Sequence, residues 1–384
     1  MPIDFSVLIA YRDRNPEVVN LCLQSLSQQT YSNFEVCFLD YGSEFTTQAE
    51  VKALTQNFPF VRYFVSQTQG HFWNRSKALN FLAQQAQHEH ILVLDIDLVL
   101  TSTFLEVLAN YSSRYKLLSY AVYWLPPNGL ISHFLSNTVL LAKLPCSYAR
   151  GCIAYHKTDL FAVGGYDEFY CIWGVEDLDL VARIEYFTKQ NIQEIPLHEG
   201  YAFHVWHQTV ANQMPTNWYK YLYHYYFEQK KAQNFANTVN YLAQPISLLN
   251  MQDRPILLQR EQPDSSQIID FHFTFPFLRS FNLFYHTFYT LPKGKFLRIK
   301  QKFSPLPQKS TSFKVKILQT LNYFLQKLSI SYRFTEIIYY DTELVTANEI
   351  RSFLFYFIHT FKAEIKDYYF DFQNDTIECW LHKG

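Results

Sequence analysis

Two aspartates stand close together in the most apolar stretch of the chain. Asp95 and Asp97 belong to the sequence ILVLDIDLVL at residues 91–100, which we expect to form a buried strand. Residues two apart on a strand face the same side, so both carboxylates could reach one divalent cation that bridges to a diphosphate. The alternative is a pair of surface aspartates in a turn or at a helix start, and the spacing alone does not separate the two.

A second pair of acids, Glu176 and Asp177, follows shortly after Trp173. An aromatic platform beside a carboxylate suits removal of a proton from a sugar hydroxyl by a general base. The alternative is that the acids only interact favourably with the dipole of the helix that they begin. Farther along, His204 and His207 are three residues apart and could hold one ion, although each could also be an ordinary core or surface histidine.

The elements that must position these residues alternate along the first half of the chain. The expected strands are residues 5–11, 34–40, 61–67 and 91–100, and the expected helices are 16–29, 46–58 and 74–87. Such alternation favours a mainly parallel sheet that helices cover on both faces. Ligands bind such sheets beyond the carboxyl ends of the strands, where residues 11–14, Asp40 and 95–97 are found.

Charge and composition argue against several classes of protein. Lys and Arg number 33 against 34 Asp and Glu, a net charge of −1, which argues against a nucleic-acid-binding protein. The six cysteines form no CxxC pair or zinc-like spacing, as expected in a reducing compartment. The first ten residues lack the basic segment of a signal peptide, and no apolar run approaches the roughly 20 residues of a membrane span. We therefore expect a cytoplasmic protein.

The second half of the chain differs from the first in charge and composition. Residues 1–200 carry 13 basic against 20 acidic side chains, whereas residues 201–384 carry 20 against 14. The shift predicts three regions: a catalytic domain at 1–225, a helical connection at 226–265 and a smaller aromatic-rich α+β region at 266–384.

A basic stretch at 279–333 contains no acid, and its segment 312–330 has the pattern of a basic amphipathic helix. This stretch could contact the inner face of an anionic membrane, where lipid-linked acceptors would be found. The favoured alternative is a solvated basic face packed on the domain. The aromatic content of 35 Phe, 29 Tyr and 6 Trp indicates a ring-rich core more than a sugar-binding platform.

Five segments, taken in order, resemble the GT-A fold nucleotide-sugar glycosyltransferases. They are Tyr11-Arg12-Asp13-Arg14, Trp73-Asn74-Arg75-Ser76-Lys77-Ala78-Leu79-Asn80, Asp95-Ile96-Asp97, Trp173-Gly174-Val175-Glu176-Asp177 and His204-Val205-Trp206-His207. The likeness is greatest to glycosyltransferase family 2 and the β4-galactosyltransferase-like group, and it extends over residues 3–210. It implies a GT-A (Rossmann-like) fold with a mixed, mainly parallel sheet flanked by helices.

The resemblance implies that one group of residues binds the nucleotide-sugar donor. Arg12, Arg14 and Asp40 would contact the nucleotide, with Asp40 at the uracil edge. The remaining donor contacts would come from Phe72 or Trp73 beside the base or ribose, Arg75 at the diphosphate, Asp95 at the ribose and metal shell, and Trp173 and Gly151 near the sugar.

The resemblance also implies a bound Mn²⁺ or Mg²⁺ and an acceptor site. Asp97 and His207 would be metal ligands, with His204 as a third. Glu176 would hydrogen-bond the acceptor, and Asp177 would be the catalytic base.

Four positions depart from the patterns of these families. Asp13 replaces the usual Asn, Tyr41 a second Asp, Val175 a frequent Gly, and His204 the Met of some relatives. Val175 could stiffen its loop or crowd the acceptor side, and His204 could make the metal shell harder. The donor sugar and the acceptor therefore stay open.

The sequence thus predicts a metal-dependent, inverting glycosyltransferase that moves a sugar from a UDP-sugar to a glycan or lipid-linked glycan in capsule or lipopolysaccharide synthesis. Two alternatives stay open. A GT-A scaffold without catalysis could bind carbohydrate or polyanions, and a nucleotidyltransferase would use a similar acidic metal site. The nucleotidyltransferase alternative is weakened because no Gly-rich phosphate loop follows the first strand.

Overall fold

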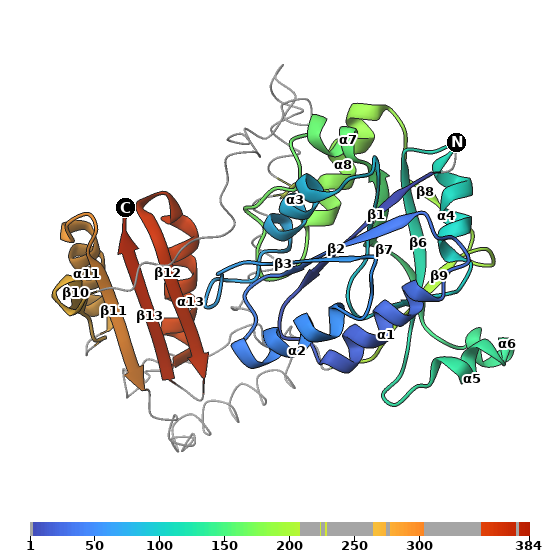
Figure 1. The fold of residues 1–384 in the computed structure, drawn as a ribbon. Coiled ribbons are helices and arrows are strands. Elements are labelled where there is room, and N and C mark those ends of the chain that lie inside the picture. Colours follow the sequence, from blue (N-terminus) through green and yellow to red (C-terminus); the bar gives the residue numbers. More distant parts are fainter. Residues whose placement is uncertain are drawn as a thin grey trace, which may run out of the picture. The chain divides into compact units, whose positions relative to one another are not determined.

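The computed structural model describes residues 3–207, 223, 227–228, 264–273, 277–302, 347–373 and 376–384. The chain divides into two compact units, Met1–Arg260 and Glu261–Gly384, which are described separately as unit 1 and unit 2 (Figure 1). The predicted helical connection and the predicted amphipathic helix at 312–330 lie almost wholly outside the described residues. The domain limits drawn from the sequence therefore stay predictions.

Unit 1 begins with four parallel strands in the order β3-β2-β1-β4. They are β1 (Phe5–Tyr11), β2 (Phe34–Asp40), β3 (Val61–Val65) and β4 (His90–Val93), connected by α1 (Pro16–Ser27), α2 (Phe45–Thr55) and α3 (Arg75–Gln85). Helix α1 begins with Pro16 next to its cap Asn15, whose side chain accepts the backbone N–H of Glu17. The predicted alternation of strands and helices is confirmed in this part of the chain.

The rest of the sheet mixes parallel and antiparallel pairs beyond β4. Its strands are β7 (Cys146–His156), β6 (Leu117–Trp124), β9 (Tyr201–His204) and β5 (Leu98–Leu100), with β8 (Gln193–Glu194) beside β6. The helices of this part are α4 (Phe104–Ser112), α5 (Ile131–Leu135), α6 (Thr138–Leu141), α7 (Lys157–Ala162) and α8 (Glu176–Thr188). The result is a mixed sheet with helices on both faces, and the predicted fold class is confirmed (Figure 1).

Strand β1 shows why the sheet must be covered on both sides. Val7 and Ile9 pack in one apolar cluster with side chains of α1 and α4, whereas Leu8 packs in a second cluster with α3 and α8. Successive residues of a strand point to opposite faces, so an apolar run such as this one needs a layer on each side.

One predicted strand is wrong. Residues 91–100 form two short strands, β4 and β5, and Asp95 and Asp97 lie in the turn between them. The backbone N–H of Leu98 donates to the carbonyl of Asp95 at 3.0 Å and closes this turn. The two carboxylates therefore do not share one face of a pleat, and each has different neighbours.

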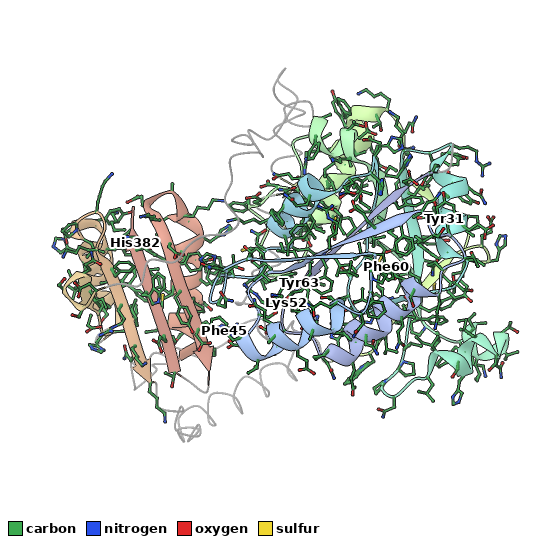
Figure 2. All side chains as sticks on the ribbon, viewed as in Figure 1. Tyr31, Phe45, Lys52, Phe60, Tyr63 and His382 are labelled. Carbon is green, nitrogen blue, oxygen red and sulfur yellow. The ribbon has the colours of Figure 1, made fainter. Side chains whose placement is uncertain are left out.

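Unit 2 is an α+β unit with a ring-rich core, as expected. Its sheet has the order β10-β11-β13-β12, from β10 (Ile268–Asp270), β11 (Phe296–Lys302), β13 (Thr376–Lys383) and β12 (Ile365–Gln373). Helices α11 (Phe277–Thr290) and α13 (Ala347–Thr360) meet through aromatic side chains. Figure 2 shows the side chains of this unit on its ribbon. Phe284 is fully buried, and its ring centroid lies 4.9–5.3 Å from those of Phe271, Phe353 and Phe357.

Within the described residues, no helix has the length and apolar character that crossing a membrane requires.

Candidate active site

The candidate site lies where the order of the parallel strands changes direction. From β1 the chain continues to β2 on one side, while β4 occupies the other side of β1. Open α/β sheets bind ligands beyond the carboxyl ends of the strands at such a point. The residues that follow β1 and β4 at this edge include Arg14 and Asp97, which lie 3.9 Å apart.

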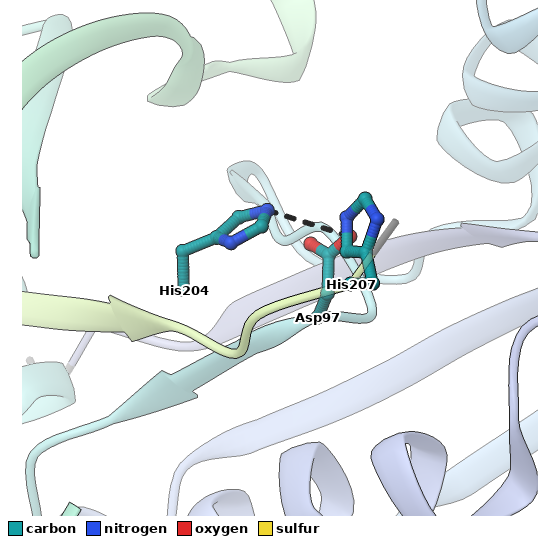
Figure 3. A group of neighbouring side chains, drawn as sticks. All are labelled: Asp97, His204 and His207. Carbon is teal, nitrogen blue, oxygen red and sulfur yellow. Dashed lines mark ion pairs between the residues drawn. The ribbon is translucent and has the colours of Figure 1, made fainter. Parts of the chain in front are cut away.

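Asp97, His204 and His207 form a compact group of metal-binding side chains (Figure 3). One ligand atom from each lies within 4.8 Å of the others. The Asp97 Oδ2 atom is 3.0 Å from His207 Nε2 and 3.7 Å from His204 Nε2. Within the described residues, this is the group of three that could hold a metal ion.

Strand pairing explains how this group comes together. Antiparallel pairing of β5 with β9 sets Leu98 opposite His204, and the backbone N–H of Val205 donates to the Asp97 carbonyl at 2.8 Å. The indole of Trp124 packs on the His204 ring with centroids 4.4 Å apart. Residues more than a hundred positions apart in the chain are thereby fixed next to one another.

The electrostatics of the group favour metal binding. Burial raises the pKa of Asp97, but the hydrogen bond from His207 and the nearby charges of His204 and Arg14 outweigh it, so the pKa is lowered. Burial also lowers the pKa of His204, which favours the neutral imidazole that binds metals. Two imidazole nitrogens and one carboxylate oxygen suit a divalent transition metal.

Arg75, the first residue of α3, connects several acids of the site. Its guanidinium donates to Asp95 Oδ1 at 2.9 and 3.1 Å and to Asp177 Oδ1 at 2.7 Å, and it lies 3.8 Å from Glu176 Oε1. A further bond of 3.3 Å reaches the backbone carbonyl of Gly151 on β7. A Cβ atom at position 151 would lie 2.9 Å from Asp177 Oδ2, so any larger residue there would displace this carboxylate.

Glu176 is the first residue of α8 and is buried. Burial, together with the charge of Asp177, raises the pKa of Glu176 to about 7, against the opposing charge of Arg75. Of two adjacent acids, one is thus buried and holds its proton near neutral pH, and the other is paired with an arginine. Such divergent environments are typical of acids with different roles in a reaction.

The loop before α8 has an unusual backbone. Ile172, Gly174 and Val175 have φ angles of 68°, 93° and 79°. A β-branched residue in this left-handed region is strained, and Val175 stands where the resembled families often have glycine. The backbone N–H of Ile172 donates to the Trp73 carbonyl at 2.7 Å. The next residue, Trp173, is 60% exposed.

On the predicted nucleotide side, charged residues hold loops in place. Arg12 donates to the backbone carbonyls of Tyr41, Thr68 and His71 at 2.6–2.8 Å. Its guanidinium also lies 5.1 Å from the Tyr41 ring centroid and 5.9 Å from that of Trp73. These bonds bring the segments after β1, β2 and β3 together.

Asp40 is fully buried at the end of β2. Its Oδ1 accepts the backbone N–H of Ser43 at 2.8 Å, and its Oδ2 accepts the hydroxyl of Tyr63 at 3.1 Å. The carboxylate therefore fixes the turn after β2, and its contact with uracil stays a prediction.

Sequence reasoning missed residues that hold the 164–170 loop. Asn80 on α3 donates to the carbonyl of Tyr166 at 2.9 Å and accepts its N–H at 2.8 Å. Arg183 and Asp179 form a fully buried ion pair at 2.8 Å on α8, and Arg183 also donates to the carbonyls of Val163 and Gly165. A polar residue on the buried face of a predicted helix was the available signal for Asn80, because buried polar groups need partners.

Two models of known protein families match consecutive parts of unit 1. The model described as glycosyl transferase family 2 matches residues 6–127. The model described as the N-terminal domain of galactosyltransferase matches residues 139–208. Together the matches contain the residues after β1 and β4, the acids of α8 and both histidines of the metal-binding group.

Solved structures with partial similarity include two of the same protein. The crystal structure of S. aureus TarS is 18% identical, with 53% of this chain and 37% of that chain covered and a TM-score of 0.41. The crystal structure of S. aureus TarS 1–349 is 20% identical, with 53% and 60% covered and a TM-score of 0.40. The matched region thus spans less than two thirds of either structure. A search of curated proteins finds no match.

Proposed function

We propose that the protein transfers a sugar from a UDP-sugar to a hydroxyl group of a glycan, with inversion at the anomeric carbon. The premise is that residues 6–127 and 139–208 match two glycosyltransferase family models on a GT-A fold. The acceptor that we propose is a surface glycan of the capsule or lipopolysaccharide type, free or linked to a lipid. The UDP donor and the class of glycan come from the family resemblance.

The observation that carries this proposal is the position of Arg75. It joins Asp95, next to the metal-binding group, with Asp177 at the start of α8. One edge of the sheet therefore brings together side chains that can hold a metal, an arginine and two acids. A transfer reaction from a nucleotide sugar needs these parts for the leaving diphosphate and for the attacking hydroxyl.

Asp97, His204 and His207 would hold a divalent ion, Mn²⁺ or Mg²⁺, and the two imidazole nitrogens favour Mn²⁺. When bound, such an ion neutralises negative charge on a diphosphate. Arg14, 3.9 Å from Asp97, adds a positive charge at the same place.

Asp177 is the proposed base. Its carboxylate takes the proton of the acceptor hydroxyl while the hydroxyl oxygen bonds to the anomeric carbon. The bond from that carbon to the phosphate oxygen breaks, and its electron pair leaves with UDP. Glu176, protonated below its pKa of about 7, would hydrogen-bond the acceptor.

For the donor, we propose contacts from the residues around Arg12 and Asp40. Trp73 lies beside the Arg12 guanidinium and would flank the base or ribose, while exposed Trp173 would cover the sugar. A membrane contact through the basic stretch 279–333 stays part of the proposal, although residues 303–333 of it lie outside the described part of the chain.

The test is a panel of nucleotide sugars, with and without Mn²⁺, in which released UDP is measured. The wild type is compared with Asp97→Ala, with Asp177→Asn and with the matched control Asp4→Asn, which changes an exposed acid before β1. We expect UDP release from one donor that depends on the metal, persists in the control and falls at least about a hundredfold in the two site variants.

Three results would contradict the proposal. Binding of no UDP-sugar would exclude the donor class, and release of pyrophosphate would indicate a nucleotidyltransferase. Full activity of Asp177→Asn would exclude Asp177 as the base. The anomeric configuration of the product, read by NMR, tests inversion separately.

A further inference from the structure

The connection between β6 and β7 carries an apolar projection. It contains the short helices α5 and α6, and we call residues 126–145 the α5–α6 hairpin. In unit 1 the hairpin projects beyond the end of β6, away from the covering helices α1 and α4 (Figure 1). Leu130, Leu135, Val139 and Leu140 are 57, 52, 65 and 40% exposed. Other exposed large apolar residues of unit 1, such as Phe45 and Phe187, lie singly on separate helices.

The hairpin is apolar on its inner side as well. Ile131, Phe134, Leu141 and Leu144 pack against the small cluster of Tyr123, Leu125 and Phe203. The side chain of Asn137 accepts the N–H groups of Val139 and Leu140 and caps α6, so this polar group serves the hairpin itself. Ser132, His133, Ser136 and Thr138 are exposed as well, so the outer side of the hairpin carries its four large apolar side chains among polar ones. Large exposed apolar side chains that gather in one short segment are typical of a surface that contacts a second apolar environment.

The hairpin and the segments that flank it in the sequence carry no acid. No acidic residue occurs between Glu106 and Asp159, and the titratable side chains of the hairpin are His133 and Lys143. An exposed apolar segment with basic and without acidic groups suits the boundary between lipid head groups and acyl chains.

We propose that the α5–α6 hairpin docks unit 1 on a lipid bilayer, with Leu130, Leu135, Val139 and Leu140 inserted at the head-group boundary. Helices of five and four residues are far too short to span the bilayer, so the contact is peripheral. A second copy of the chain fits less well. A symmetric dimer would place this acid-free surface against itself, with no carboxylate for Lys143.

The position of the hairpin links the membrane to the candidate site. Strand β6 ends at Trp124, directly before the hairpin, and Trp124 pairs in register with His204. Docking would hold the metal-binding group close to the bilayer. A benefit for lipid-linked acceptors rests on the proposed function, whereas the docking itself does not.

The test measures co-flotation of the full chain with vesicles of equal parts phosphatidylcholine and phosphatidylglycerol, without nucleotide sugar. The double variant Leu135→Gln/Val139→Gln removes the apolar surface without adding charge. Phe45→Gln is the matched control, because Phe45 is 76% exposed at the start of α2 (Figure 2). We expect the double variant to bind at least about tenfold more weakly and the control to bind like the wild type.

Two further measurements keep the test specific. Hydrogen exchange should slow in residues 130–144 when vesicles are added. Lys143→Gln should weaken binding to anionic vesicles but leave binding to neutral vesicles unchanged. Unchanged flotation of the double variant would overturn the proposal, as would a wild-type dimer that the double variant dissociates. Since no donor is present, a protein that turns over no sugar could still bind, so failure here and failure of the proposed function are distinguishable.

Discussion

Unit 1 buries an arginine–aspartate pair among its apolar side chains, whereas the described core of unit 2 is built mainly of aromatic rings. In unit 1, the guanidinium of Arg75 lies among three carboxylates, and Arg183 forms a fully buried pair with Asp179. In unit 2, the rings of α11 and α13 pack edge to face around Phe284, while the Arg298–Asp270 pair is largely exposed. Each unit thus places its ion pairs differently.

Buried ion pairs and buried aromatic rings affect stability in different ways. Buried ion pairs contribute little net stability, but loss of one partner is costly because an unpaired charge is left behind. Packed aromatic rings stabilise a fold through the apolar area that they bury, and they provide no charged groups. Unit 1 therefore fixes its charged groups in place at the cost of sensitivity to single substitutions. The described part of unit 2 rests mainly on its aromatic core, with one partly buried pair between Lys383 and Glu364.

The largest effect should follow from Arg75→Met. It leaves Asp95, Glu176 and Asp177 without their shared cation, so we expect unit 1 to lose about 3–5 kcal/mol of stability and UDP release to become undetectable. Urea unfolding and hydrogen exchange in α3 and α8 measure the loss. Arg75→Lys keeps the positive charge but loses the planar guanidinium. Its stability should therefore lie between those of the wild type and Arg75→Met. A variant as stable as the wild type would contradict the electrostatic account.

Phe284→Ala should destabilise unit 2 and spare the reaction. Removal of a fully buried ring should cost about 3–5 kcal/mol, seen as faster exchange in α11 and α13. UDP release by unit 1 should be unchanged under conditions where both proteins are folded. Loss of UDP release with normal exchange in α13 would show that the two units do not divide stability and chemistry in this way.

The stability of unit 1 should depend on pH through Glu176, and this effect is the third largest that we expect. The pKa of Glu176 in the folded protein is about 7, above its ordinary value, so the folded state binds this proton more tightly. Its contribution to stability is present below about pH 4.5 and is lost as the pH rises through about 7, on the order of 3 kcal/mol. Glu176→Gln should remove this slope, which urea unfolding of both proteins across this range would reveal. An equal slope in both would assign it to another group.

The smallest effect should come from Arg298→Met in unit 2. This arginine makes two bonds to Asp270, at 2.6 and 2.9 Å, but both side chains are well exposed to water. Exposed pairs contribute little, so we expect no measurable shift in the urea midpoint. Compared with Arg75→Met, it isolates the effect of burial on an arginine–aspartate pair. A large destabilisation here would remove the contrast between the units.

Local patterns in the sequence predict much of the secondary structure of unit 1. The expected strands 5–11 and 34–40 coincide with β1 and β2, because a strand buried on both faces is a short apolar run in any context. The strand expected at 91–100 was wrong, because apolar periodicity does not register a turn made by Asp95 and Asp97. Asp95 pairs with Arg75 and Asp97 pairs with His207, and neither partner lies within the predicted strand.

The candidate site was visible only in part for the same reason. Asp97, His204 and His207 were expected to meet and do so, although their roles stay predictions. Asn80 and Arg183 act through contacts with backbone carbonyls of a distant loop, which leave no motif in the sequence. The stacking of Trp124 on His204 depends on the pairing of β6 with β9 and likewise had no local signal.

The contact between Arg14 and His207 joins residues 193 positions apart in the chain. A ribosome that adds about 5–20 residues per second needs roughly 10–40 seconds to make the chain between them. During that time β1 to β4 can already pair, but Asp97 has neither histidine beside it. Within the described part of unit 1, the metal-binding group is therefore among the last features to be assembled during synthesis. A nascent chain shorter than about two hundred residues would carry the four parallel strands without β9 and without this group.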